Sequence, residues 1–390
     1  MSFSRYAVFA LVVALLSGAI HGYLWLRLVH TPLWPAPWPR VLSIALVVLA
    51  LWLPATILGN WFLPDVLRVP VAWIGYVWLG TMFLLFSWCL LLEVPRVALW
   101  VAERIGTEVL EPDRRQFLGR VAAAVAGVGA LSMATWGLVS VALPLRVKRV
   151  TVSLPGLPKA LHGFRIVQLT DIHVGPTIGG QFIDEIVAKV NELGADMVAI
   201  TGDLVDGSVD ELGDAVRGLS RLQSREGTYF VTGNHEYYSG ADAWVAFLGE
   251  AGIRVLRNER VAVERGDGTL YVAGVDDHQA VRFGNGHGAD FDAALGGREP
   301  GHPTVLLAHQ PKAFHSARKH GVDLQLSGHT HGGQIFPFGF LVRLAEPFVL
   351  GLHRVGQSQI YVSGGTGYWG PPMRVGVPAE ITLLTLESSP

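Results

Sequence analysis

The first third of the chain consists of long apolar runs separated by short polar links. Four runs contain no Asp, Glu, Lys or Arg, and each is long enough to cross a bilayer, which takes about 20 residues. Buried core helices are the alternative, but uncharged runs of this length favour membrane spans. We therefore predict an all-α transmembrane region over residues 1–143, with four spans at about 6–26, 41–63, 71–92 and 121–143.

From residue 144 to residue 390 the apolar runs become short and alternate with segments of helical periodicity. Residues 164–170 and 197–201 have the pattern of buried strands, and residues 182–193 between them place apolar side chains at helical spacing. Such alternation predicts right-handed βαβ crossovers and a largely parallel sheet. After residue 251 short strands follow one another without full-length helices, which predicts a second sheet packed on the first. We therefore expect an α/β domain over 144–390.

Composition and charge narrow the class of protein. Half of the residues are hydrophobic and only 16% are charged, and the excess of apolar residues lies in the first third. The formal net charge of −2 gives no indication of a nucleic-acid partner. The single cysteine, Cys89, lies in an apolar run, so an intramolecular disulfide and a thiolate metal site are both excluded.

Arginine placement predicts the orientation in the membrane. The link between the third and fourth runs holds five arginines and the first link two, whereas the second link holds one. The positive-inside rule therefore places the first and third links in the cytoplasm and the 144–390 domain on the other side of the cell membrane. Basic residues at 146, 148 and 149 favour the opposite orientation mildly.

Five strand-like runs of the C-terminal domain end directly in Asp, Asn or His. In open α/β sheets ligands bind beyond the carboxyl ends of the strands, so these residues are expected to converge. A single His-x-His pair is a weak signal, but five metal-competent ends together indicate a metal site. The five motifs read Asp171-x-His173, Gly202-Asp203-x-x-Asp206, Gly233-Asn234-His235-Glu236, His309 and Gly328-His329-x-His331.

These motifs resemble the pattern of the calcineurin-like metallophosphoesterases: D-x-H, G-D-x-x-D, G-N-H-[DE], a lone H and G-H-x-H. The resemblance covers roughly residues 144–390, and Thr170–His173 and Gly328–Gln334 resemble the membrane-associated branch. That branch includes twin-arginine-exported phosphodiesterases and a lipid A-pathway hydrolase of UDP-2,3-diacylglucosamine. The resemblance implies a four-layer α-β-β-α sandwich.

It also implies a site for two divalent metal ions bridged by Asp203. Oxygen and imidazole ligands without sulfur suit Mn, Fe, Zn or Co. Two divalent ions and two carboxylates leave a net charge near +2, which suits a phosphate and a bridging hydroxide. The implied ligands are Asp171, His173, Asp203 and His331 for one metal, and Asp203, Asn234, His309 and His329 for the other.

The family pattern gives the neighbouring polar residues other roles. His235 is implied to be a catalytic residue that protonates the leaving oxygen or stabilises the charged transition state. Asp206 and Glu236 are expected to orient histidines, and Glu236 has the alternative of a carboxylate at a helix N-terminus.

The third link holds a further motif. Arg114–Leu118 resembles a twin-arginine export signal, although it follows three spans, and a plain membrane-flanking arginine pair is the alternative. Residues 140–142 have the small-x-small form of a signal-cleavage site.

We therefore predict a membrane-anchored, dinuclear metal-dependent phosphoesterase. It would hydrolyse a phosphomonoester, phosphodiester or pyrophosphate through metal-bound hydroxide. The apolar run Ile335–Leu341 is either core strand and turn or a wall for a lipid-linked substrate such as UDP-2,3-diacylglucosamine. Membrane lipids are the other expected partner. The alternative function is a non-catalytic metal- or phosphate-binding sensor tethered to the membrane.

Overall fold

The computed structural model describes residues 3–106, 111–284 and 286–388 of the chain. These residues form two compact units. The first comprises Met1–Ala142 and Gly370–Val375, and the second comprises Leu143–Trp369 and Gly376–Pro390.

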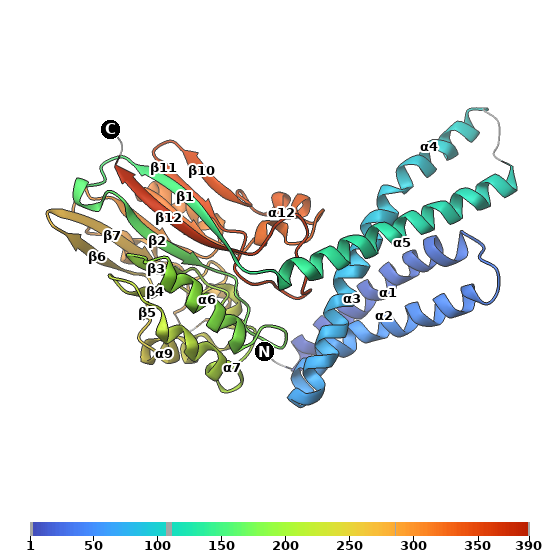
Figure 1. The fold of residues 1–390 in the computed structure, drawn as a ribbon, viewed down its shortest axis with the longest axis horizontal. Helices are drawn as coiled ribbons and strands as arrows, with labels where there is room; N and C mark the ends of the chain where they lie inside the picture. The colour runs from blue at the N-terminus through green and yellow to red at the C-terminus, as the bar shows by residue number, and fades with distance from the viewer. Residues whose placement is uncertain (1–2, 107–110, 285, 389–390) are drawn as a thin grey trace. The chain divides into compact units, whose positions relative to one another are not determined.

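The first unit is helical (Figure 1). Among the described residues, four stretches are long and apolar enough to cross a membrane: Leu11–His30, Trp38–Gly59, Val66–Arg104 and Pro112–Ala142. This agrees with the predicted number of spans. The sequence pattern had not predicted the short helix α4, which directly follows α3 within the third link. The helices are α1 (Phe3–Trp25), α2 (Trp38–Phe62), α3 (Asp65–Leu91), α4 (Glu93–Arg104) and α5 (Pro112–Ala142).

Polar contacts inside this unit join its helices. His21 on α1 is buried; its Nδ1 donates to the carbonyl of Ser17 at 2.7 Å, and its Nε2 accepts from the Trp78 indole of α3 at 3.0 Å. Both ring nitrogens are therefore satisfied in the neutral form, which indicates a structural role. Arg115, in the twin-arginine-like motif, pairs with Glu103 of α4 at 2.7 Å.

The second unit contains two six-stranded sheets within the described residues. In the first sheet, in the order β1-β12-β2-β3-β4-β5, all neighbours are parallel except β12 and β2. Its strands are β1 (Arg146–Leu154), β12 (Glu380–Ser388), β2 (Phe164–Leu169), β3 (Met197–Ile200), β4 (Thr228–Phe230) and β5 (Arg254–Val255).

The second sheet has the order β10-β11-β9-β8-β7-β6. Its two edge pairs are antiparallel, and the pairs between them are parallel. Its strands are β10 (Gly351–Val355), β11 (Ser358–Val362), β9 (Leu324–Ser327), β8 (Thr304–Leu307), β7 (Gly268–Gly274) and β6 (Glu259–Arg265).

Helices cover the outer face of each sheet. Ile183, Ile186, Val187 and Val190 form the buried face of α6, as their spacing predicted. The remaining helices are short. The helices of this unit are α6 (Gly180–Glu192), α7 (Val209–Val216), α8 (Asn234–Ser239), α9 (Ala241–Glu250), α10 (Phe291–Leu295), α11 (Phe314–Lys319) and α12 (Gly339–Ala345).

Three buried apolar clusters define the layers. One joins α6 and α9 to the first sheet, through residues such as Ile186 and Val198. The second lies between the sheets and contains Ile166 with Val272. The third joins the second sheet to α10 and α11. The predicted α-β-β-α sandwich, preceded by four long apolar helices, is therefore confirmed.

Three local expectations need correction. The sequence pattern of residues 212–222 predicts a single helix, but α7 ends at Val216 and continues as a 3₁₀ turn over Arg217–Arg221. The sequence pattern of residues 349–355 predicts a strand over the whole run, but β10 begins only at Gly351. The run 335–341 is not a core strand, because it leads into α12, none of whose residues is buried.

Candidate active site

The predicted site residues follow the carboxyl ends of five central strands. Asp171 and His173 follow β2, Asp203 follows β3, and Asn234 and His235 follow β4 in the first sheet. His309 follows β8, and the pair His329 and His331 follows β9, in the second sheet. Because parallel strands end at the same edge of a sheet, both sheets deliver these side chains to one place.

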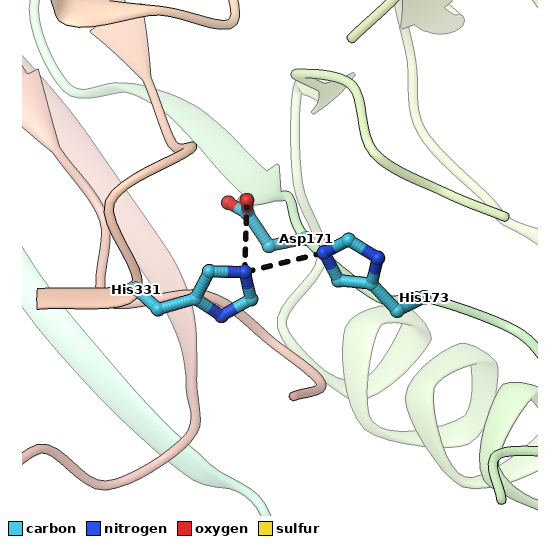
Figure 2. A group of neighbouring side chains, drawn as sticks. All are labelled: Asp171, His173 and His331. Carbon is cyan, nitrogen blue, oxygen red and sulfur yellow. Dashed lines mark hydrogen bonds and ion pairs between the residues drawn. The ribbon is translucent and has the colours of Figure 1, made fainter. Parts of the chain in front are cut away.

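The first group of side chains is formed by Asp171, His173 and His331 (Figure 2). The Nε2 atoms of His173 and His331 are 3.2 Å apart, and His331 Nε2 lies 3.4 Å from Asp171 Oδ1. The Nδ1 of His173 donates to Asp206 Oδ1 at 3.0 Å, so in the neutral ring Nε2 carries a lone pair. Electron-rich atoms this close fit a cation between them.

The second group is formed by Asp203, His309 and His329, which can present one ligand atom each within 4.8 Å of one another. The Nδ1 of His309 donates to the Thr201 carbonyl at 2.8 Å, so in the neutral ring Nε2 carries the lone pair. This Nε2 and the Oδ1 of Asn234 are buried without a hydrogen-bond partner among the described residues. Buried acceptors are normally satisfied, so these two also fit a metal ion.

Asp203 lies between the two groups. Its Oδ2 is 3.0 Å from His309 Nε2 of the second group and 3.9 Å from His173 Nε2 of the first. Burial alone would raise the pKa of the Asp203 carboxyl, but His309 and His235 outweigh burial and hold it well below its usual range. An ionised carboxylate in this position can contact cations on both sides.

The backbone of the site is strained. Five of the seven predicted ligands have positive φ angles, a region that costs a non-glycine residue about 1–3 kcal/mol. Hydrogen bonds between the loops hold this geometry: Asp171 N donates to Gly202 O at 3.0 Å, and His329 N donates to Asp171 Oδ1 at 2.9 Å. The φ angles are 52° for Asp171, 55° for His173, 51° for Asp203, 71° for His329 and 49° for His331.

Two glycines of the motifs are required by close approach. A Cβ on Gly202, whose φ is +86°, would lie 2.6 Å from the backbone nitrogen of Gly233. A Cβ on Gly328 would lie 2.1 Å from Asp171 Oδ2. The glycines therefore let the loops that carry the site approach one another.

His235 lies beside the two groups and is held by Asp206. Its Nδ1 is 2.6 Å from Asp206 Oδ1, the oxygen that also accepts from His173, and its Nε2 lies 4.0 Å from Asp203 Oδ2. Burial lowers the pKa of His235, but Asp203 and Asp206 outweigh it and raise the pKa to about 9. The two carboxylates therefore favour the cationic form of the ring, with a proton on each nitrogen.

Glu236 does not orient a histidine, which was one of its two expected roles. Its carboxylate instead accepts hydrogen bonds from the backbone nitrogens of Asp203 (3.0 Å), Leu204 (2.8 Å) and Gly233 (2.6 Å). Burial and the nearby Asp203 raise its pKa to about 7. The side chain caps α8, as the alternative predicted, and it also ties the loop after β3 to the loop after β4.

The sequence patterns did not assign three further residues near the site. Tyr238 and Trp369 place their rings 5.2 Å and 5.8 Å from the ring of His235. Asp277 is buried, and its Oδ1 accepts from Gln310 Nε2 at 3.0 Å, next to His309. Asp277 follows the end of β7, so the rule of polar residues at strand ends could have found it.

Comparison with known families agrees with the fold and the site. A family model described as calcineurin-like phosphoesterase matches residues 164–333, which contain all the predicted ligands. The chain belongs to this family of metallophosphoesterases. With its four candidate spans, it is a membrane-anchored phosphoester hydrolase.

Its relatives include proteins named "Transmembrane protein with metallophosphoesterase domain". The protein of that name from Bos taurus is 41% identical over 330 residues, covering 81% of this chain and 74% of the relative. The one from Danio rerio is 42% identical, covering 66% and 61%. Among solved structures, the phosphopantetheinyl hydrolase of Mycobacterium tuberculosis aligns over 56% of this chain at 12% identity, with a TM-score of 0.34.

Proposed function

We propose that the site holds two divalent cations with Asp203 as the bridge. The observation that carries this proposal is the convergence of buried acceptors on both sides of Asp203, two of which lack any described hydrogen-bond partner. When bound, such a pair of cations supplies an activated water and neutralises the phosphoryl oxygens. Asp171, His173 and His331 complete one ligand set, and Asn234, His309 and His329 complete the other.

We assign His235 the role of proton donor to the leaving oxygen. Asp206 holds the ring through Nδ1, so the proton on Nε2 is the one available for transfer. When Nε2 gives up its proton, Nδ1 keeps its own and still donates to Asp206, which fixes the neutral tautomer. The same carboxylate keeps His173 in the tautomer whose Nε2 faces the first group.

The arrangement favours hydrolysis over a tethered sensor. A binding domain needs the ligands alone, whereas here a histidine outside both proposed ligand sets is held beside them by Asp206, the carboxylate that also orients His173. The sensor alternative expects bound metal without turnover of any phosphoester, which the test below would reveal.

For the substrate we propose a phosphoester or pyrophosphate that carries an apolar tail, with UDP-2,3-diacylglucosamine as one representative of this class. Support comes from the membrane spans and from Phe336, Phe338 and Phe340, which are exposed a few residues after His331. The same proposal places the catalytic domain on the non-cytoplasmic side of the cell membrane, opposite the Arg-rich links.

A substrate panel tests the proposed function. The full chain in nanodiscs, supplied with Mn²⁺, is assayed on aryl phosphates, aryl phosphodiesters, soluble nucleotides and lipid-linked pyrophosphates. We expect hydrolysis with the highest kcat/KM for a lipid-linked compound. Equal kcat/KM for soluble nucleotides and lipid pyrophosphates would contradict the lipid assignment, and no turnover of any member with metal bound would favour the sensor.

A further inference from the structure

Large apolar side chains are exposed together on the second unit, close in sequence to the last predicted ligands. Phe336 is 55% exposed, and Phe340, Leu341 and Leu344 on α12 are 60%, 56% and 86% exposed. We call these four residues, together with Trp369, the α12 surface. Because α12 buries none of its residues, the core of the domain does not explain why this helix is apolar.

The α12 surface is attached to the candidate active site through Trp369. The side-chain amide of Gln334 donates to the Trp369 carbonyl at 3.0 Å, and the Trp369 nitrogen donates to Gln334 Oε1 at 2.9 Å. This pair of bonds fixes Trp369 to the segment that leads into α12. The Trp369 ring in turn lies 5.8 Å from the ring of His235. A displacement of the α12 surface would therefore shift Trp369 against the ring of His235.

The segment that contains α12 carries a positive charge at its exposed surface. Arg343 is the only charged residue in the sequence 335–345, and it is exposed. The next acidic residue, Glu346, is buried and pairs with Lys312 at 2.8 Å, so it does not offset Arg343 at the surface. Exposed Phe and Leu beside an Arg are typical of helices that lie in the interfacial layer of a bilayer, where the cation meets anionic headgroups.

We propose that the α12 surface docks into the interfacial layer of an anionic bilayer. The spans of the same chain anchor the domain to a bilayer, so the effective concentration of membrane at the α12 surface is high. Weak insertion of a few side chains is therefore enough for docking. Docking of this kind presents His235 and its neighbours to the headgroup level of the membrane. It is a property of the surface alone and goes beyond the proposed function, since it requires neither metal nor turnover.

Site-directed spin labelling of the full chain tests the docking. Cys89, the single cysteine, is replaced by serine, and in this Cys89→Ser background a nitroxide is attached to the cysteine introduced by Leu344→Cys. The matched control is Ala262→Cys, an exposed position on β6 at the opposite edge of the second sheet from β10. Collision rates with oxygen, which concentrates in the bilayer, and with a water-soluble nickel chelate are measured in nanodiscs that contain phosphatidylglycerol.

We expect the label at 344 to collide preferentially with oxygen and the label at 262 with the nickel chelate. Preference of the 344 label for the nickel chelate would overturn the proposal. Protection of the 344 label from both reagents would also overturn it, because a protein partner or a second copy would then cover the surface. The readout does not involve hydrolysis, so failure here is distinguishable from failure of the proposed function.

A second variant tests the role of Arg343. In the Leu344→Cys protein, raising the phosphatidylglycerol fraction is expected to increase the oxygen preference. The added substitution Arg343→Ala should remove this dependence on lipid charge while leaving bound metal unchanged. If the oxygen preference still rises with the phosphatidylglycerol fraction in the Arg343→Ala protein, the assignment of the anionic headgroup as the partner of Arg343 is overturned.

Discussion

His235 Nδ1 donates to Asp206 Oδ1 across 2.6 Å, and the same oxygen accepts from His173 Nδ1 at 3.0 Å. One carboxylate oxygen thus orients the proposed proton donor and a proposed metal ligand together. In the proposed function, Asp206 would therefore couple metal binding to proton transfer while contacting neither the metal nor the substrate.

The substitution Asp206→Asn tests this coupling. The amide keeps the shape of the side chain but removes its charge, so His235 and His173 are left with a neutral and weaker acceptor to fix their tautomers. We expect activity to fall by about 10–100-fold, as is usual when such an orienting carboxylate is changed. Steady-state kinetics provide the measurement, with Asp210→Asn, an exposed acid on α7, as the control. Parent-like kcat in the Asp206 variant would contradict the role.

Metal removal should destabilise the second unit. The buried carboxylates Asp171 and Asp203 and the unpartnered acceptors near them lose their counter-charge when a chelator removes the metals. A ligand present at 100 times its Kd stabilises the folded state by about 2.7 kcal/mol, so we expect chelator to lower Tm and Mn²⁺ to restore it. Thermal unfolding monitored by circular dichroism measures the shift. A Tm that is identical with chelator and with Mn²⁺ would speak against a resident metal site.

The substitution Gly328→Ala should disturb the first ligand group. The added Cβ would lie 2.1 Å from Asp171 Oδ2 and from Thr170 Oγ1, so Asp171 must move. We expect reduced metal content and a loss of about 1–3 kcal/mol in the free energy of unfolding, as for other overpacked sites. Gly249→Ala is the control, because a Cβ there meets nothing within 4 Å. Metal content equal to the parent's in the Gly328 variant would refute the steric argument.

Reporter fusions test the orientation. The positive-inside rule applied to the Arg-rich first and third links predicts that the C-terminal domain faces away from the cytoplasm. Alkaline phosphatase, which is active only outside the cytoplasm, should be active when fused after Pro390 and inactive when fused after Gly106 in the third link. The reverse pattern would show that Arg146, Lys148 and Arg149 determine the topology instead.

The strand ends were predictable from sequence because each apolar run stops at a polar residue, and this signal is local. Asp171, Asp203 and His309 could be assigned to one site without knowing which strands pair. The position of β12 was different. Residues Glu380–Ser388 insert between β1 and β2, far away in sequence, and no local pattern specifies such a partner.

The surroundings of the site were harder to predict for a similar reason. Tyr238 is an exposed aromatic residue of a short helix, and Trp369 lies in a loop, so neither has a periodicity that marks it. Their position beside His235 depends on tertiary contacts such as the bonds between Gln334 and Trp369. The run 335–341 was ambiguous because the same apolar residues suit a core strand and turn or a wall for a lipid-linked substrate.

The central claim is that Asp203 bridges two metals, whereas His235 acts only on the leaving group. The most direct test combines elemental analysis of bound metal with steady-state kinetics for Asp203→Ala and His235→Ala. Asp203→Ala should lose most of its metal and its activity, because both ligand groups lose their shared carboxylate. His235→Ala should keep its metals and lose kcat by ~10²–10⁴-fold, the usual contribution of one general acid. Loss of metal from His235→Ala, or its turnover at the parent rate, would contradict the account.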